Sequence, residues 1–216
     1  MDFAAARHNM VESQIKPNRV TDVFVMEALA KLPRENFVPK ALQGIAYVDE
    51  AVDIGGGRHL MEAWVLARLL QTAEVQSDDI ALVIGCGSGY EAAVMSTLAS
   101  TVVALEENSS LAKQADTVLG ELSIDTVAVV EGSMAEGYAK QAPYDVIFIN
   151  GAVPEIPEAL SSQLAEGGRL VAIVGEGAYG KGTLVTNFDG IVTSREVFDA
   201  GTPTLPGFEQ DKAFSF

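Results

Sequence analysis

The hydrophobic positions in the second half of the chain fall into five short, continuous runs. These runs cover residues 80–84, 102–105, 127–130, 146–149 and 170–174, and stretches with a helical pattern near 89–99, 109–122 and 155–165 separate most of them. Short apolar runs rich in β-branched residues that alternate with helices are typical of a buried parallel sheet. The pattern therefore predicts an α/β fold with five parallel strands.

The pattern changes after the fifth run. Residues 183–188 and 191–198 read as two further strands, and they flank Asp189-Gly190, a dipeptide typical of a tight hairpin turn. We expect this hairpin to be antiparallel and to bring the sheet to seven strands. The next segment, residues 202–208, contains two prolines and predicts an extended stretch that packs on the rest of the fold.

The first third of the chain predicts helices joined by irregular turns. Residues 2–16 fit a helix that stops at Pro17, and Thr21 can cap a second helix that ends before Pro33. A glycine-rich loop at residues 54–59 then precedes a helix from Leu60 to about Thr72, with Met61 on its apolar stripe. We therefore expect a helical extension and a loop ahead of the sheet.

Length and composition indicate one compact unit. The chain has 216 residues, of which 48% are apolar, and this is enough for a single α/β domain with a modest extension. We assign residues 1–76 to the helical extension and substrate loop, and residues 77–216 to the core. No apolar run reaches the ~18–20 residues of a membrane span, and the N-terminal residues lack the pattern of a signal peptide. These features predict a cytoplasmic protein.

The net charge of the chain narrows the range of possible partners. Its net charge is −16, with the acidic residues scattered along the sequence. Such a surface repels phosphate backbones and anionic lipids, so we expect neither nucleic acid nor a membrane as a partner. Cys86 is the only cysteine, and His8 and His59 lie far apart. The sequence therefore predicts no disulfide, no metal site and no catalytic thiol.

The clearest candidate for ligand binding is the turn after residues 80–84. Gly85, Gly87 and Gly89 follow the apolar run and lead into a helical stretch. Closely spaced glycines let the backbone approach a ligand, and a helix N-terminus offers free N–H groups. Glu106 ends the next apolar run, where an acid can accept hydrogen bonds from both ribose hydroxyls. We interpret this as a nucleoside site, with a purely structural turn as the alternative.

The spacing of the glycines narrows the choice of cofactor. Dinucleotide-binding folds use Gly-X-Gly-X-X-Gly, but here the third glycine comes one residue early and Tyr90 takes its place. This spacing disfavours NAD and favours S-adenosylmethionine, which has no pyrophosphate. A P-loop is excluded because no Gly-Lys-Ser/Thr follows the turn.

Several segments of the chain match one protein family. They are Leu-Pro-Arg-Glu-Asn-Phe-Val-Pro at 32–39, Ile-Gly-Gly-Gly at 54–57, Ile-Gly-Cys-Gly-Ser-Gly-Tyr at 84–90, Glu106, residues 144–157 with their Pro-Glu-Ile-Pro end, and residues 163–171. On these segments the chain resembles the protein-L-isoaspartate O-methyltransferase family of class I S-adenosylmethionine-dependent methyltransferases. The resemblance covers roughly residues 10–175.

The resemblance implies a fold, a reaction and a set of partners. The fold would be a Rossmann-like class I methyltransferase, the cofactor S-adenosylmethionine, and the partner a protein or peptide that contains isoaspartate. The family repairs such proteins by methylating the α-carboxylate of the isoaspartyl residue. A carboxylate is already ionised at pH 7, so the reaction needs no general base. Alignment of the reactants can supply ~7–11 kcal/mol at best, and we therefore expect no dedicated catalytic residue.

The resemblance also implies roles for individual residues. The loop at 56–61 would lie over the reacting methyl group, and Arg58 can pair there with an acceptor carboxylate or remain a solvated charge. Trp64 can cover the cofactor or pack in the core. The substrate-side residues are then Gly57, Arg58, His59 and Met61, and the cofactor-side residues are Gly85, Gly87, Gly89, Glu106, Ser133, Leu60 and Trp64.

Three positions depart from the family pattern. Met61 stands where the family has a serine, Val83 where it has an acid, and Ser133 where it has an aspartate that reads the adenine amino group. A thioether is at best a weak acceptor and never a donor, so Met61 cannot orient a carboxylate as a hydroxyl can. Two alternatives therefore stand beside the isoaspartyl enzyme: a non-catalytic S-adenosylmethionine-binding module, and a methyltransferase with a different acceptor.

Overall fold

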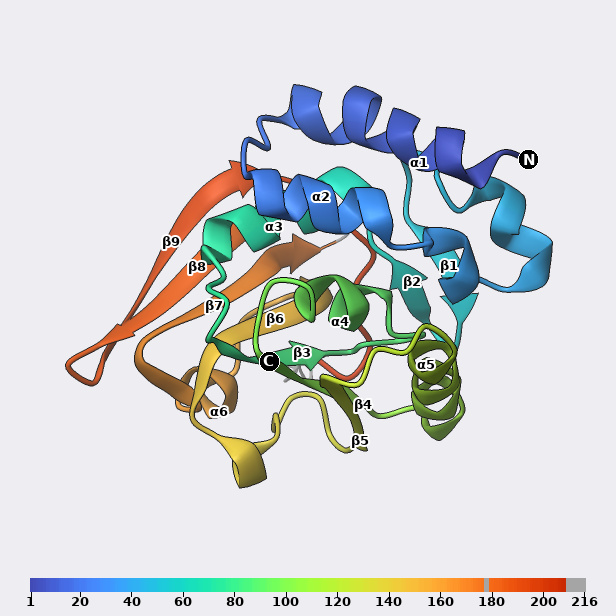
Figure 1. The fold of residues 1–216 in the computed structure, drawn as a ribbon. Coiled ribbons are helices and arrows are strands. Elements are labelled where there is room, and N and C mark those ends of the chain that lie inside the picture. Colours follow the sequence, from blue (N-terminus) through green and yellow to red (C-terminus); the bar gives the residue numbers. More distant parts are fainter. Residues whose placement is uncertain (177–178, 209–216) are drawn as a thin grey trace, which may run out of the picture.

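The computed structural model describes residues 1–176 and 179–208 and is built around a seven-stranded sheet (Figure 1). The strand order is β5-β4-β3-β6-β7-β8-β9. The five strands from β3 to β7 are parallel, and β8 and β9 are antiparallel to their neighbours. The predicted sheet is thus confirmed. The strands are β3 (Ile80–Ile84), β4 (Thr101–Glu106), β5 (Val127–Glu131), β6 (Tyr144–Val153), β7 (Leu164–Glu176), β8 (Tyr179–Phe188) and β9 (Ile191–Asp199).

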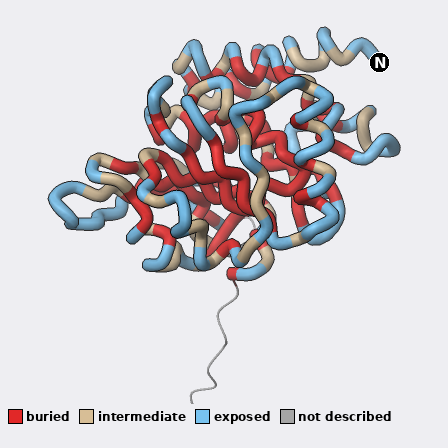
Figure 2. The backbone as a smooth tube through the Cα atoms, turned by 60° about the horizontal axis from the view of Figure 1, so that its bottom comes forward, coloured by how far each residue is buried: buried red, intermediate tan, exposed pale blue. Residues whose placement is uncertain are grey.

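Both faces of the inner parallel strands β3, β4 and β6 are buried (Figure 2), whereas the edge strand β5 is partly exposed. Because side chains alternate along a strand, Val83 lies in one hydrophobic cluster while its neighbours Leu82 and Ile84 lie in another. Burial on both faces explains why the strands read as continuous apolar runs rather than alternating ones. Val83 is fully buried against the helices, so at this position the chain has an apolar contact in place of the family's acid.

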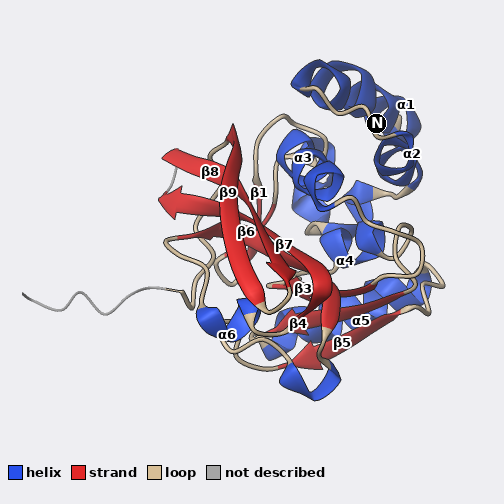
Figure 3. Cartoon of the chain, turned by 90° about the vertical axis from the view of Figure 1, so that its left-hand side faces the viewer, coloured by secondary structure: helices blue, strands red, loops and turns tan. Residues whose placement is uncertain are grey.

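Three helices pack on the face that contains Val83: α3 (Ala63–Ala73), α4 (Tyr90–Met95) and α5 (Ser109–Glu121). On the opposite face lies the short helix α6 (Glu158–Ser161) (Figure 3). The helix expected near 155–165 is therefore much shorter than predicted. Pro157 precedes its first turn, and β7 already begins at Leu164.

The N-terminal helices lie outside α3 (Figure 1). The helix α1 (Phe3–Met10) continues through a π-helical turn (Val11–Ile15) and a 3₁₀ turn (Lys16–Asn18), so the predicted helix is confirmed with a modified end. The helix α2 (Val23–Lys31) is capped by Asp22, whose carboxylate accepts from the backbone N–H groups of the next turn. The prediction of Thr21 as the cap is wrong, because the helix begins one residue later than expected and Asp22 holds the cap position. Two 3₁₀ turns follow, Arg34–Phe37 and Lys40–Ile45.

The glycine-rich loop forms a small hairpin, which we call the site hairpin (residues 52–60). Its strands are β1 (Val52–Gly55) and β2 (Arg58–Leu60), and they pair antiparallel. The helix α3 begins only at Ala63, so Leu60 and Met61 lie before it rather than in its first turn. The loop prediction is therefore only partly right: the glycines make the turn of a hairpin.

The segment after β9 crosses the end of β6, and we call it the strap (residues 202–208). The backbone N–H of Ala152 donates to the carbonyl of Pro203 at 3.0 Å, and the N–H of Leu205 donates back to the Ala152 carbonyl at 2.8 Å. This confirms the expected extended, packed conformation. The prediction of a tight turn between β8 and β9 is also confirmed, since Asp189 and Gly190 have φ of 51° and 72°.

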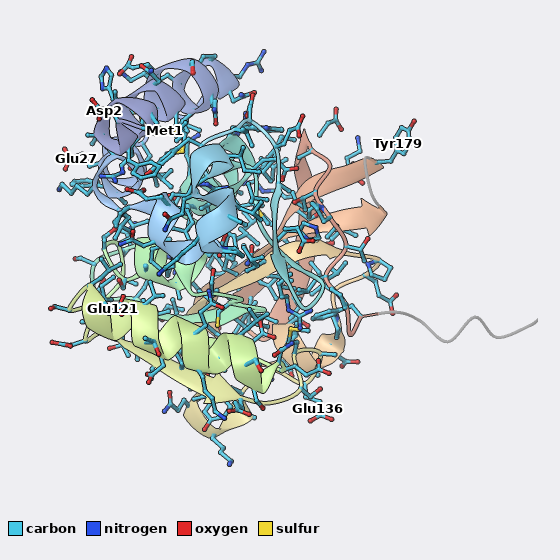
Figure 4. The ribbon with its side chains drawn as sticks, turned by 90° about the vertical axis from the view of Figure 1, so that its right-hand side faces the viewer. Met1, Asp2, Glu27, Glu121, Glu136 and Tyr179 are labelled. Atoms are coloured by element: carbon cyan, nitrogen blue, oxygen red, sulfur yellow. The ribbon has the colours of Figure 1, made fainter. Side chains whose placement is uncertain are left out.

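The surface carries the acidic residues in separate places. Glu27 on α2, Glu121 on α5 and Glu136 in the turn after β5 are exposed and point outward (Figure 4). None of the helices in the described part of the chain is long and apolar enough to cross a membrane.

Candidate functional site

The glycine turn between β3 and α4 is fixed to the sheet by its own backbone. The N–H groups of Gly85 and Cys86 both donate to the carbonyl of Leu105 in β4, at 2.9 and 3.2 Å. Gly85, Gly87 and Gly89 have φ of 70°, 54° and 97°, which only glycine adopts at low cost. A Cβ on Gly89 would lie 3.2 Å from Cβ of Ala115 in α5, so this glycine serves the packing of two helices.

Glu106 ends β4 directly beside this turn, and its side chain is fully buried. Its Oε2 accepts from the backbone N–H of Gly87 at 2.9 Å, and its Oε1 accepts from the N–H groups of Glu107 and Asn108 at 3.0 and 2.9 Å. The structure thus brings together the turn and the acid that the sequence singled out. Three backbone N–H groups thus hold the carboxylate in position.

Arg58 of the site hairpin is bound to the same carboxylate. Its Nη2 donates to Oε1 of Glu106 at 3.0 Å and its Nε to Oε2 at 3.3 Å. Both side chains are buried, with 5% exposure for Arg58 and 0% for Glu106. With the three backbone donors, Glu106 now accepts five hydrogen bonds. A carboxylate has about four lone-pair sites, so its acceptor capacity is used up.

Apolar side chains cover the glycines of the turn. A Cβ built on Gly85 would lie 2.8 Å from Leu205 of the strap, and one built on Gly87 would lie 2.7 Å from Ile54 of the site hairpin. Leu205 and Ile54 are 2% and 5% exposed. The glycines therefore do permit a close approach to the backbone, but here the approaching groups belong to the chain itself.

We call the space enclosed by the glycine turn, Glu106, the site hairpin and the strap the crevice. Little of it remains open. A cavity of about 10 Å³ lies between the site hairpin, β6 and the strap, and it is lined among others by Arg58, Met61, Asn150 and Leu205. That is room for about one water molecule, whereas ligand pockets usually measure ~300–1,000 Å³. The donor and acceptor set around Glu106 suits a ribose, yet in this conformation the crevice does not fit an adenosyl group.

The predicted substrate-side residues lie on the site hairpin and just after it. Gly57 is exposed, and a Cβ there would meet Pro206 of the strap at 3.0 Å. His59 is partly exposed and lines the same small cavity. Met61 is 1% exposed, and its carbonyl accepts from Nη2 of Arg34 at 2.6 Å. The structure therefore brings the predicted loop to the crevice, with its Met61 side chain packed inward.

The other predicted cofactor-side residues lie elsewhere. Leu60 is fully buried in the core. Trp64 packs against Phe198 of β9 with ring centroids 6.4 Å apart, rather than at the glycine turn. Ser133 is exposed in the turn after β5. Its neighbour Met134, in contrast, is buried, and its sulfur lies 3.4 Å from Nη2 of Arg58.

Sequence reasoning missed Glu91, the second residue of α4. It is buried, and neither carboxylate oxygen has a hydrogen-bond partner among residues 1–176 and 179–208. Burial raises its pKa to about 7, although Arg34 nearby favours the charged form. A lone acid in the apolar stretch Tyr-Glu-Ala-Ala-Val-Met was the signal that could have revealed it.

Cys86 lies inside the turn and is fully buried. Burial raises the pKa of its thiol, and the Glu106 carboxylate adds to the effect, so the thiol stays protonated and unreactive. In residues 1–176 and 179–208, no group of three or more His, Cys, Asp or Glu side chains is arranged to hold a metal ion.

Comparisons with known proteins agree on one family. Residues 5–195 match the family model described as protein-L-isoaspartate(D-aspartate) O-methyltransferase. The chain is 41% identical over 169 residues to the protein-L-isoaspartate O-methyltransferase of Methanoculleus marisnigri, covering 78% of this chain and 77% of that protein. It is 39% identical over 173 residues to the enzyme of the same name from Koribacter versatilis, covering 80% and 78%.

Solved structures give the same result for the fold. A protein-L-isoaspartate O-methyltransferase superposes with a TM-score of 0.79 at 25% identity, over 94% of this chain and 67% of that one. A putative protein-L-isoaspartate O-methyltransferase from Plasmodium falciparum, solved with S-adenosyl-L-homocysteine, superposes with a TM-score of 0.77 at 21% identity, over 93% and 98%. The predicted Rossmann-like fold is thereby confirmed.

Proposed function

Because the chain belongs to the protein-L-isoaspartate(D-aspartate) O-methyltransferase family, we propose that it methylates the carboxylate of an isoaspartyl residue in a protein or peptide, with S-adenosylmethionine as methyl donor. The observation that carries this proposal is the family match over residues 5–195, which includes both the site hairpin and the turn with Glu106. The curated relatives support transfer over a non-catalytic module.

The local chemistry is compatible with this reaction. The acceptor carboxylate is ionised near neutral pH, so the protein has to orient it rather than deprotonate it. We assign Gly85, Gly87 and Glu106 to the cofactor side of the crevice, and Arg58 and His59 to the acceptor side. The net charge of −16 favours a peptide over nucleic acid as the acceptor.

A transfer assay with matched peptides tests the proposal. The purified chain is incubated with S-adenosylmethionine carrying a labelled methyl group and a peptide with one isoaspartyl residue. The control is the same peptide with an ordinary aspartyl residue. We expect a base-labile methyl ester on the isoaspartyl peptide alone. Equal labelling of both peptides, or none by folded protein at millimolar cofactor, would contradict the proposal.

A further inference from the structure

We propose that the site hairpin and the strap form an internal plug that closes the crevice. In this state Arg58 takes the place of a ribose on Glu106, and Leu205 and Ile54 cover the glycine turn. The cofactor binds only after these side chains leave. The inference rests on the proposed function and adds a means of regulating the same site.

Arg58 competes directly with a nucleoside. Its Nη2 and Nε present two N–H donors to the two oxygens of one carboxylate. The two hydroxyls of a ribose would present the same number of donors to the same acceptor. Because Glu106 already accepts five hydrogen bonds, a ribose can bind only in exchange for Arg58. The exchange leaves the three backbone bonds to Glu106 intact.

The strap closes the crevice from the opposite side. Leu205 lies against Gly85 and also against Gly151 of β6. A Cβ built on Gly151 would lie 2.8 Å from the Cβ of Leu205. The strap is attached to β6 through Ala152, and the hydroxyl of Thr202 donates to Oε2 of Glu62 at 2.8 Å. The attachment to Ala152 lies beyond Ile149, where the pairing of β6 with β3 ends, and Glu62 precedes α3, so the strap can separate while the pairing of β3 with β6 stays intact.

A closed ground state lowers the apparent affinity for cofactor. The measured dissociation constant equals the intrinsic one divided by the fraction of molecules that are open. If one molecule in a hundred is open, the apparent affinity falls about a hundredfold. Substitutions that weaken the plug and spare Glu106 should therefore tighten binding rather than weaken it.

Calorimetric titration with S-adenosyl-L-homocysteine tests the plug without reference to activity. The proteins are the wild type, Arg58→Gln and Leu205→Ala, each checked for folding by its thermal transition. Arg195→Gln, at an exposed position on β9, is the control for the lost charge. We expect Arg58→Gln and Leu205→Ala each to bind at least tenfold more tightly than wild type, and Arg195→Gln to match it.

The outcomes separate the plug from the proposed function. If the wild type binds the ligand and folded Arg58→Gln and Leu205→Ala bind it no more tightly, the plug is overturned and the proposed function stands. If none of the folded proteins binds at millimolar ligand, the proposed function fails and the plug fails with it. If Arg58→Gln does not fold, Leu205→Ala decides, because it leaves all donors to Glu106 in place.

Discussion

The two sides of the crevice are held in different ways. On one side, the glycine turn and Glu106 are fixed by backbone hydrogen bonds to β4 and to one another. On the other side, the site hairpin and the strap meet the turn through the side chains of Arg58, Ile54 and Leu205. Backbone bonds within a sheet persist when a surface segment opens locally. The groups that would bind a nucleoside, the glycine turn and Glu106, are thus already in position. Separate segments, the site hairpin and the strap, control access to them.

The largest expected effect comes from the fixed side. Glu106→Ala removes the carboxylate that is bonded to the buried Arg58 and should destabilise the fold by ~3–5 kcal/mol. Arg58→Ala should cost clearly less, because Glu106 keeps three backbone donors. Urea unfolding of both variants measures the difference. An equal or larger cost for Arg58→Ala would mean that the site hairpin belongs to the scaffold.

Glu91, which follows the glycine turn, should make the stability of the fold depend on pH. Burial raises its pKa in the folded state to about 7, from an ordinary value of 4.5. Between these values the unfolded chain ionises while the folded one keeps its proton, so stability should fall as pH rises. The loss should be ~3 kcal/mol, complete above pH 7, and absent below pH 4.5.

Denaturant titrations from pH 4.5 to 8 compare wild type with Glu91→Gln, which should lack this decline. The exposed Glu121→Gln is the control and should follow the wild type. If Glu91→Gln and wild type change in parallel over the whole range, Glu91 is ionised in the fold and the argument from burial is wrong.

A substitution in the glycine turn should have a smaller effect on stability. Gly89→Ala forces a side chain into φ of 97° and places a Cβ 3.2 Å from Ala115, which should cost ~1–3 kcal/mol. Gly44→Ala is a matched control, because a Cβ there meets nothing within 4 Å and φ is not positive. Thermal unfolding should separate the two variants. Similar melting temperatures would show that the turn can relax.

The smallest effect is expected at the strap. Thr202→Val removes the hydrogen bond from the threonine hydroxyl to Glu62, worth ~0.5–1.5 kcal/mol. Amide hydrogen exchange in residues 202–207 should become faster, while exchange in β3 and β4 stays as in wild type. Faster exchange in β3 or β4 would show that the strap and the sheet open together.

The sequence predicted the scaffold because its signals are local. The strands from β3 to β9, the turn at Asp189 and the position of Glu106 each follow from short patterns of apolar residues, glycines and a terminal acid. Two positions in the first third of the chain show where sequence patterns are less decisive. Asp22 rather than Thr21 caps α2, because the helix begins one residue later than the pattern indicated. Trp64 had two open places, and its contact with Phe198, 134 residues further along the chain (198 − 64), fits packing in the core.

The closed crevice could not be predicted from the sequence. A glycine turn followed by a strand-end acid indicates where a ligand would bind, but it does not reveal which groups cover that place. Arg58 and Glu106 are 48 residues apart, and the strap reaches Gly85 from 120 residues away (205 − 85). The substitution of Met61 for the family's serine is local and was visible, as was its place on an apolar stripe, which agrees with its burial.

A crystal structure of the wild-type chain grown with S-adenosyl-L-homocysteine tests the central claim most directly. The account predicts that the backbone of residues 85–89 and the three backbone bonds to Glu106 stay as they are. The ribose should replace the guanidinium of Arg58 on Glu106, and Leu205 should no longer cover Gly85. A ligand bound while the Arg58–Glu106 pair and the Leu205 contact remain in place would contradict it.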